Sequence, residues 1–206
     1  YARKNYKGKT GDPITTESLR NIMTAIKTFV KRMYLLEVLS TDPLGRMELP
    51  KKPRRIPKNI LDQEQVEKVF EQSLLYGNIG YRDRTILEVF YAAALRRKEL
   101  VNLNINDINF KKQELRVNQG KGNKDRIVPI APRALDWLTY YLKRIRPQLS
   151  TIESGEALFV NNKGRRYQDG HMSELVTKYI KLSGVADSGS CCTFRHSSAT
   201  HMLEGG

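Results

Sequence analysis

Prolines at positions 43, 50, 53 and 57 constrain the fold of this 206-residue chain more than any other feature. Proline has no amide hydrogen to donate and its ring clashes with the preceding helical turn, so no helix can continue through this segment. The segment also carries the basic run "KKPRRIPK". Such composition is typical of a linker. It predicts a helical domain over residues 1–50, a basic linker over 51–59 and a larger domain over 60–206.

The charge of the chain indicates its class of partner. Lys and Arg number 36 against 22 Asp and Glu, which leaves a formal net charge of +14. Basic side chains that neutralise phosphates release condensed counterions, so this excess favours nucleic acid as the partner, with a merely soluble basic surface as the alternative. The candidate contacts lie in the linker, on the first long helix and in a glycine-bearing turn: Lys51, Lys52, Arg54, Arg55, Arg20, Lys27 and Lys124. A simply solvated linker is the competing interpretation.

Two further patterns bear on compartment. No apolar run approaches the length needed to span a bilayer, and the N-terminal residues lack the apolar core of a signal peptide. The only cysteines, Cys191 and Cys192, are adjacent and lack the spacing of a zinc site or a framework disulfide. These patterns predict a cytoplasmic protein with no membrane partner.

Hydrophobic periodicity predicts a mainly α fold with one small antiparallel β-sheet, an α+β arrangement. A capping box at Asp62 and Gln65 marks the start of the second helix, and Gly184 is a candidate C-cap. The turn "GKGNK" joins the last two predicted strands. Helices are predicted over residues 16–39, from 63, and over 82–95, 133–145 and 171–182, and strands over 105–110, 113–119 and 125–130.

Three cationic residues far apart in the sequence stand out. Arg96 is predicted at the end of a helix, Lys121 in the turn of a hairpin, and Arg195 near the start of the last helix. Each has an ordinary explanation by itself, such as a surface arginine that interacts favourably with a helix C-terminus. Their significance therefore depends on whether they act together.

Together they resemble the tyrosine recombinases, the family of phage, transposon and Xer-type integrases. The resemblance lies in "AALRRKEL" around Arg96, "GKGNKDRIVPI" around Lys121 and "CTFRHSSATHML" around Arg195, in the family's order. It extends from about residue 13 to the end of the chain and includes the basic linker. It implies a core-binding domain over 1–50, which is partial because the family normally has helices before the one at residue 16. It also implies a catalytic domain over 60–206 that lacks its C-terminal tyrosine segment, with four copies of the protein assembled on double-stranded DNA.

The resemblance also implies a mechanism. A tyrosine attacks the scissile phosphate, giving a 3′-phosphotyrosine and a free 5′-hydroxyl, and a partner strand reverses the step. Arg96 and Arg195 would clamp the phosphate, because planar guanidinium groups match phosphate geometry. Lys121 would protonate the leaving oxygen as a general acid. One phosphodiester replaces another, so the reaction needs no cofactor, no metal and no small-molecule substrate.

Two departures from the family pattern affect this interpretation. Cys192 occupies the position where the family usually has histidine, and a thiol is a weaker hydrogen-bond donor than imidazole. All tyrosines precede Arg195, and those at 91, 140, 141 and 179 lie in apolar helical patterns that predict core packing. We therefore expect a chain truncated at both ends, with the nucleophilic tyrosine beyond Gly206, that does not itself cleave DNA.

Two alternatives remain open at this point. A recombinase-like protein that only binds DNA would fit Cys192 and the missing tyrosine. A type IB topoisomerase-like enzyme would share the covalent chemistry, although the Xer-like linker argues against it. His196 and His201 are predicted to serve in helix packing and hydrogen bonding, and His171 to lie on the surface at the start of a helix.

Overall fold

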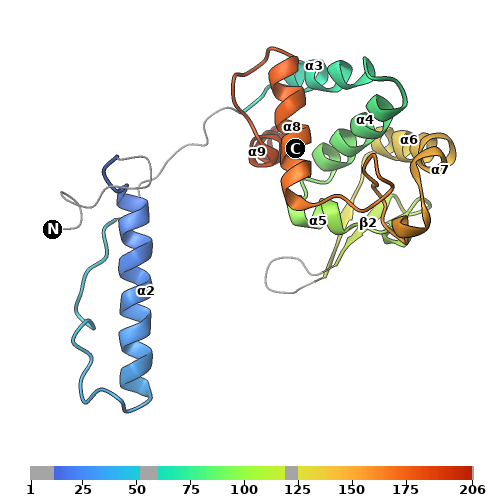
Figure 1. Ribbon diagram of the computed structural model, residues 1–206. Helices are drawn as coiled ribbons and strands as arrows, with labels where there is room; N and C mark the ends of the chain where they lie inside the picture. Colours follow the sequence, from blue (N-terminus) through green and yellow to red (C-terminus); the bar gives the residue numbers. More distant parts are fainter. Residues whose placement is uncertain (1–11, 52–59, 119–124, 206) are drawn as a thin grey trace. The chain divides into compact units, whose positions relative to one another are not determined.

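Figure 1 presents the computed structural model of the chain, which describes residues 12–51, 60–118 and 125–205. The chain divides into an N-terminal unit, residues 1–56, and a C-terminal unit, residues 57–206. Among the described helices, none is long and apolar enough to cross a membrane.

The N-terminal unit is built on one long helix, α2 (Thr16–Leu35). The Thr15 hydroxyl caps it by accepting a hydrogen bond from the amide of Ser18 at 3.1 Å. The helix was predicted to continue to residue 39. It ends at Leu35 instead, because Glu37 adopts a φ of +58° and so breaks the series of helical hydrogen bonds.

The segment that follows α2 runs back along the helix (Figure 1). Lys27 donates through Nζ to the carbonyl of Gly45 at 3.0 Å and to that of Met47 at 2.7 Å. About two turns earlier in the helix, the guanidinium of Arg20 donates to the carbonyl of Pro50. Two long cationic side chains thus hold the returning segment against the helix.

Helices make up most of the C-terminal unit, and the capping box at Asp62 and Gln65 is confirmed. The helix predicted over 133–145 is interrupted by a π-helix. The π-helix lies just before Pro147, which has no amide hydrogen to donate to the regular series of α-helical hydrogen bonds. The helices are α3 (Gln63–Leu74), α4 (Gly77–Ala92), α5 (Arg97–Asn102), α6 (Pro132–Tyr140), the π-helix η2 (Tyr141–Ile145), α7 (Arg146–Leu149), α8 (Asp169–Leu182) and α9 (Cys191–Glu204), with short 3-10 turns η1 (Ile105–Asp107) and η3 (Ile152–Ser154).

A three-stranded antiparallel sheet in the order β1-β2-β3 lies beside these helices (Figure 1). Its strands are β1 (Ile108–Asn109), β2 (Glu114–Val117) and β3 (Arg126–Pro129), and Leu115 pairs with Val128. The small sheet is confirmed. The strand predicted over 105–110 is mostly wrong, because only Ile108 and Asn109 form a strand. Residues 105–107 form a 3-10 turn instead, in which Asp107 accepts a hydrogen bond from the amide of Asn104.

The core of the C-terminal unit surrounds α4, which is buried along most of its length. Core packing was predicted for the four helical tyrosines. Tyr141 and Tyr179 are fully buried and Tyr91 is half-buried, but Tyr140 is 44% exposed. Neighbouring helical residues point about 100° apart, so Tyr140 and Tyr141 cannot both face the same core.

The turn between α4 and α5 contains a strained alanine. Ala94 has a φ of +42°, in the left-handed region that favours glycine. We expect Ala94→Gly to raise the free energy of unfolding by up to about 1 kcal/mol, since the relief of strain exceeds the entropy that glycine gains in the unfolded chain. Urea unfolding of both proteins measures the change.

Ala92→Gly provides the matched control, because Ala92 is the last residue of α4. Glycine there should lower stability by about 0.5–1 kcal/mol. If both substitutions lower stability equally, Ala94 is not strained.

Candidate active site

Arg96 is the N-cap residue of α5. The sequence placed it at the end of the preceding helix, but α4 ends at Ala92 and a turn separates the two helices, so that placement is wrong. The Arg96 amide donates to Glu99 Oε2 at 2.7 Å, and its side chain donates through Nη1 to Glu99 Oε1 at 2.7 Å. A carboxylate in the first turn of α5 therefore fixes both the backbone and the side chain of Arg96.

A second arginine binds the same carboxylate from the sheet. Arg126 on β3 donates through Nη1 to Glu99 Oε1 at 2.7 Å and through Nη2 to Oε2 at 2.8 Å. This is the bidentate geometry that makes arginine–carboxylate pairs strong and directional. Sequence reasoning did not select Arg126 as a site residue, although it lies within the box "GKGNKDRIVPI" that was identified around Lys121.

Glu99 is only 5% exposed, and it is charged. Burial by itself would raise the pKa of Glu99. The hydrogen bonds from Arg126 and from the backbone and side chain of Arg96 outweigh burial and lower that pKa to about 2. Glu99 is thus a buried anion at neutral pH that holds two guanidinium groups in place.

Arg195 lies in the first half of α9, and three contacts anchor that helix. Ser190 caps it by accepting from the amide of Cys192 at 3.2 Å. Ser197 accepts from the amide of Leu61 at 2.8 Å, and Ser198 donates to the backbone carbonyl of Tyr91. The last two bonds attach α9 to the start of the C-terminal unit and to α4, so the half-buried Arg195 side chain emerges from a fixed helix.

The three arginines influence one another. Burial lowers the pKa of Arg195, and the positive charge of Arg96 lowers it further, with Arg126 adding to the effect and Glu99 opposing it. Within the described residues, no hydrogen bond or ion pair joins the Arg195 guanidinium to a protein acceptor. Two guanidinium groups thus bind the Glu99 carboxylate, and Arg195 is near enough to interact electrostatically with all three residues. We call Arg96, Glu99, Arg126 and Arg195 the arginine cluster. Its uncompensated positive charge suits an anion.

The two cysteines differ in environment. Cys191 is buried, and burial raises the pKa of its thiol to about 11. Cys192 is exposed in the first turn of α9, three residues before Arg195. Cys192 is therefore the thiol that an incoming molecule can reach near the arginine cluster.

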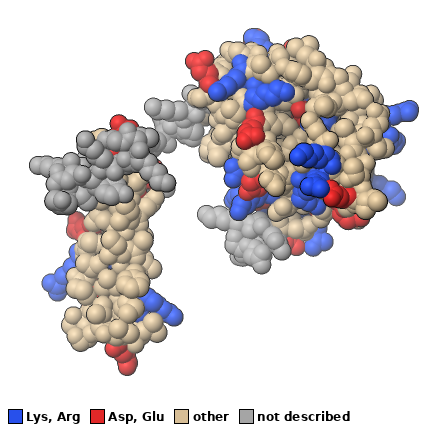
Figure 2. All heavy atoms as spheres, in the orientation of Figure 1, with Lys and Arg blue, Asp and Glu red and all other residues tan. Residues whose placement is uncertain are grey.

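The structure does not bring every candidate residue to this cluster. Lys121, Lys124, Lys52, Arg54 and Arg55 lie outside the described residues, and Lys51 is exposed. Arg20 and Lys27 belong to the N-terminal unit, where they bind the backbone carbonyls described above. Figure 2 shows further Lys and Arg side chains on the surfaces of both units.

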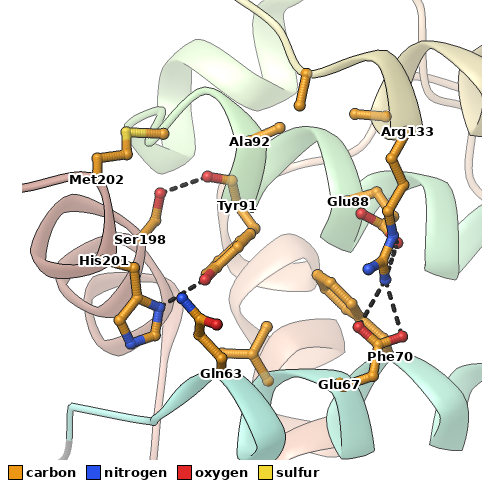
Figure 3. Close-up of a pocket in the computed structure, with 13 residues that line it drawn as sticks. Gln63, Glu67, Phe70, Glu88, Tyr91, Ala92, Arg133, Ser198, His201 and Met202 are labelled. Carbon is orange, nitrogen blue, oxygen red and sulfur yellow. Dashed lines mark hydrogen bonds and ion pairs between the residues drawn. The ribbon is translucent and has the colours of Figure 1, made fainter. Parts of the chain in front are cut away.

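A cavity of about 390 Å³ lies between α3, α4, α6 and α9 (Figure 3). On one side, Tyr91 and His201 share a hydrogen bond of 2.6 Å between the hydroxyl and Nδ1, which confirms the hydrogen-bonding prediction for His201. On the other side, Arg133 binds Glu67 and Glu88. His196, by contrast, is exposed rather than packed.

Comparison with known proteins identifies the family. Residues 59–206 match the phage integrase family, which is most of the chain. The chain belongs to this family. This match confirms the family that the three sequence boxes indicated.

Individual members of the family agree. The chain is 35% identical over 201 residues to a tyrosine recombinase XerC 2 of Ralstonia nicotianae, covering 98% of this chain but 58% of that protein. A crystal structure of XerA recombinase matches with a TM-score of 0.65 and 25% identity, over 94% of this chain and 64% of the other. A XerH recombinase described as bound to a difH substrate has a TM-score of 0.71 at 20% identity, over 93% and 56% of the two chains. The chain thus has the tyrosine recombinase fold and spans less than two thirds of these relatives.

Proposed function

We propose that the protein carries out site-specific recombination of double-stranded DNA through a 3′-phosphotyrosine intermediate. The observation that carries this proposal is the arginine cluster, in which Arg195 has no protein acceptor among the described residues while Arg96 is fixed by Glu99. The relative from Ralstonia is named a tyrosine recombinase, and the XerH neighbour is described as a site-specific recombinase bound to a difH substrate. Both names support the same reaction for this chain.

In this proposal each cationic residue has a distinct role. Arg96 and Arg195 bind the non-bridging oxygens of the scissile phosphate and stabilise the charge that builds up as the tyrosine oxygen attacks phosphorus. As the bond to the 5′-oxygen breaks, Lys121 donates a proton to that oxygen. The 5′-hydroxyl of a partner strand then attacks the phosphotyrosine, and the tyrosine leaves. One ester replaces another throughout, so the proposal includes no cofactor and no metal.

We place the nucleophile outside the tyrosines that the structure describes in the C-terminal unit. Their hydroxyl groups or rings are engaged elsewhere: Tyr141 donates to the carbonyl of Leu158, Tyr179 to Asp83, and Tyr91 bonds to His201. Within the described residues, no hydrogen bond joins a tyrosine to Arg96 or Arg195. We propose that the nucleophile lies beyond residue 206.

Contact with DNA is proposed for both units. Residues 1–50 would act as a partial core-binding domain, 51–59 as a basic linker along the DNA backbone, and 60–206 as the catalytic domain. The proposed phosphate contacts are Lys51, Lys52, Arg54, Arg55, Lys124, Arg20 and Lys27. Arg20 and Lys27 already donate to backbone carbonyls, and each has further N–H groups that are not used in those bonds. These remaining N–H groups would contact phosphate. The proposed working assembly has four copies on two DNA sites.

The 206-residue polypeptide should therefore bind duplex DNA without cleaving it. The logarithm of its affinity should fall linearly with the logarithm of the salt concentration, with a slope of roughly −0.9 for each phosphate neutralised. Fluorescence anisotropy at several salt concentrations measures the slope, and a denaturing gel detects covalent protein–DNA adducts. Affinity that is independent of salt would contradict the proposed binding, and an adduct formed by this polypeptide would contradict the proposed position of the tyrosine.

A protein that binds DNA without catalysis is the second candidate, and Cys192 in the usual histidine position favours it. The product of the entire native reading frame distinguishes the two. Recombination between two sites would support the enzyme, and DNA binding without any covalent adduct would support the binder. Relaxation of supercoiled DNA in the absence of recombination would instead indicate a type IB topoisomerase-like activity.

A further inference from the structure

Three aromatic side chains surround a shallow cavity on the C-terminal unit. Tyr81 comes from α4, Trp137 and Tyr140 come from α6, and Asp136 completes the lining of a space of about 320 Å³. The ring centre of Tyr81 lies 6.1 Å from that of Trp137 and 5.3 Å from that of Tyr140, with the rings tilted by 38° and 45°. We call these four residues the aromatic site.

The chemistry of the aromatic site favours a cation. The face of an aromatic ring carries partial negative charge and attracts ammonium and guanidinium groups. The exposed Asp136 adds a full negative charge at the rim. In the described part of the chain, no hydrogen bond or ion pair joins Asp136 to another residue. Asp136 differs in this respect from several other acidic residues, which bind arginines in a chain with a net charge of +14.

Two arginines close to Trp137, in space or along the sequence, are already bound elsewhere. The guanidinium carbon of Arg84 lies 5.1 Å from the centre of the Trp137 ring, but Arg84 is only 4% exposed and pairs with Glu88 at 2.7 Å and Glu67 at 2.9 Å. Arg133, one helical turn before Trp137, pairs with the same two carboxylates. Neither arginine is available to neutralise Asp136.

We infer that the aromatic site binds an arginine or lysine side chain presented by a partner protein. Tyr140 is 44% exposed and Asp136 is exposed, so the site is open to a side chain that projects from another surface. The π-helix that begins directly after Tyr140 is a further sign, since π-turns within helices are often found at functional sites. The arginine cluster lies on α5, β3 and α9, so this surface uses different elements.

The chain contains an internal reporter for this binding, because Trp137 is its only tryptophan. The 206-residue protein is titrated with arginine amide while tryptophan fluorescence is recorded under selective excitation. Citrulline amide, which has the same α-amino group and a side chain of nearly the same shape without the guanidinium charge, serves as the control ligand, with sodium chloride added to equal ionic strength. We expect a saturable change with arginine amide at a dissociation constant in the millimolar range, and none with citrulline amide.

Matched variants test which groups are responsible. Tyr140→Leu removes a ring from a half-exposed position and should weaken binding about threefold, as should Asp136→Asn. Tyr140→Phe retains the ring and should bind like the unaltered protein. An unchanged unfolding midpoint verifies that each variant is folded. Equal responses to the two amides, or full affinity in folded Tyr140→Leu, would overturn the inference.

Discussion

Replacing Arg195 with alanine is expected to slow DNA strand cleavage about a hundredfold or more, which corresponds to a loss of about 3 kcal/mol of transition-state stabilisation. The reason is the electrostatics of the arginine cluster. Arg195 is half-buried and feels the charges of Arg96 and Arg126, and among the described residues no acceptor neutralises it. Its charge is therefore available to the phosphate. Arg195→Lys should recover little of the rate, since an ammonium group cannot form the planar fork.

The measurement is the rate of covalent adduct formation in a single turnover, on a nicked duplex that traps the intermediate, with the product of the entire native reading frame. Arg97→Ala is the matched control: Arg97 is the neighbour of Arg96, but its side chain donates to Ser173 at 3.0 Å and lies 3.5 Å from Asp169. It should retain most of the rate. A folded, DNA-binding Arg195→Ala protein that cleaves at the original rate would eliminate the proposed role.

Replacing Glu99 with glutamine is expected to lower the free energy of unfolding by about 3 kcal/mol at neutral pH. The Glu99 pKa is about 2 in the folded protein against an ordinary 4.5, so the folded state binds this proton less readily than the unfolded state. The resulting stabilisation is fully present above about pH 4.5 and is lost as the pH falls towards about 2. Glu99→Gln should remove this part of the pH dependence.

Urea unfolding of both proteins between neutral and acidic pH tests this expectation. Glu153→Gln is the control, because Glu153 also pairs with an arginine, Arg165, but both side chains are more than half exposed. Its loss should change stability little, as is usual for surface pairs. If Glu99→Gln unfolds at the same urea concentration as the unaltered protein at every pH, the buried carboxylate does not hold the cluster together.

Much of this protein follows from the sequence alone. The apolar periodicity of the helices, the capping box at Asp62 and Gln65, and the β-branched segments of the sheet involve residues two to four positions apart. The three boxes identified the family and selected Arg96 and Arg195 as candidate site residues. These features could be predicted because local geometry, or a motif written in consecutive letters, specifies them.

Other features depended on the tertiary structure. Arg126 binds Glu99 across 27 positions of sequence, and Tyr81 meets Trp137 and Tyr140 only because α4 packs against α6. The two adjacent tyrosines, 140 and 141, have the same sequence pattern but opposite burial. Burial, ion pairing and the pKa of Glu99 all depend on which distant segments come together. Periodicity specifies which face of a helix is apolar, but only the packing of the whole chain determines which side chains that face meets.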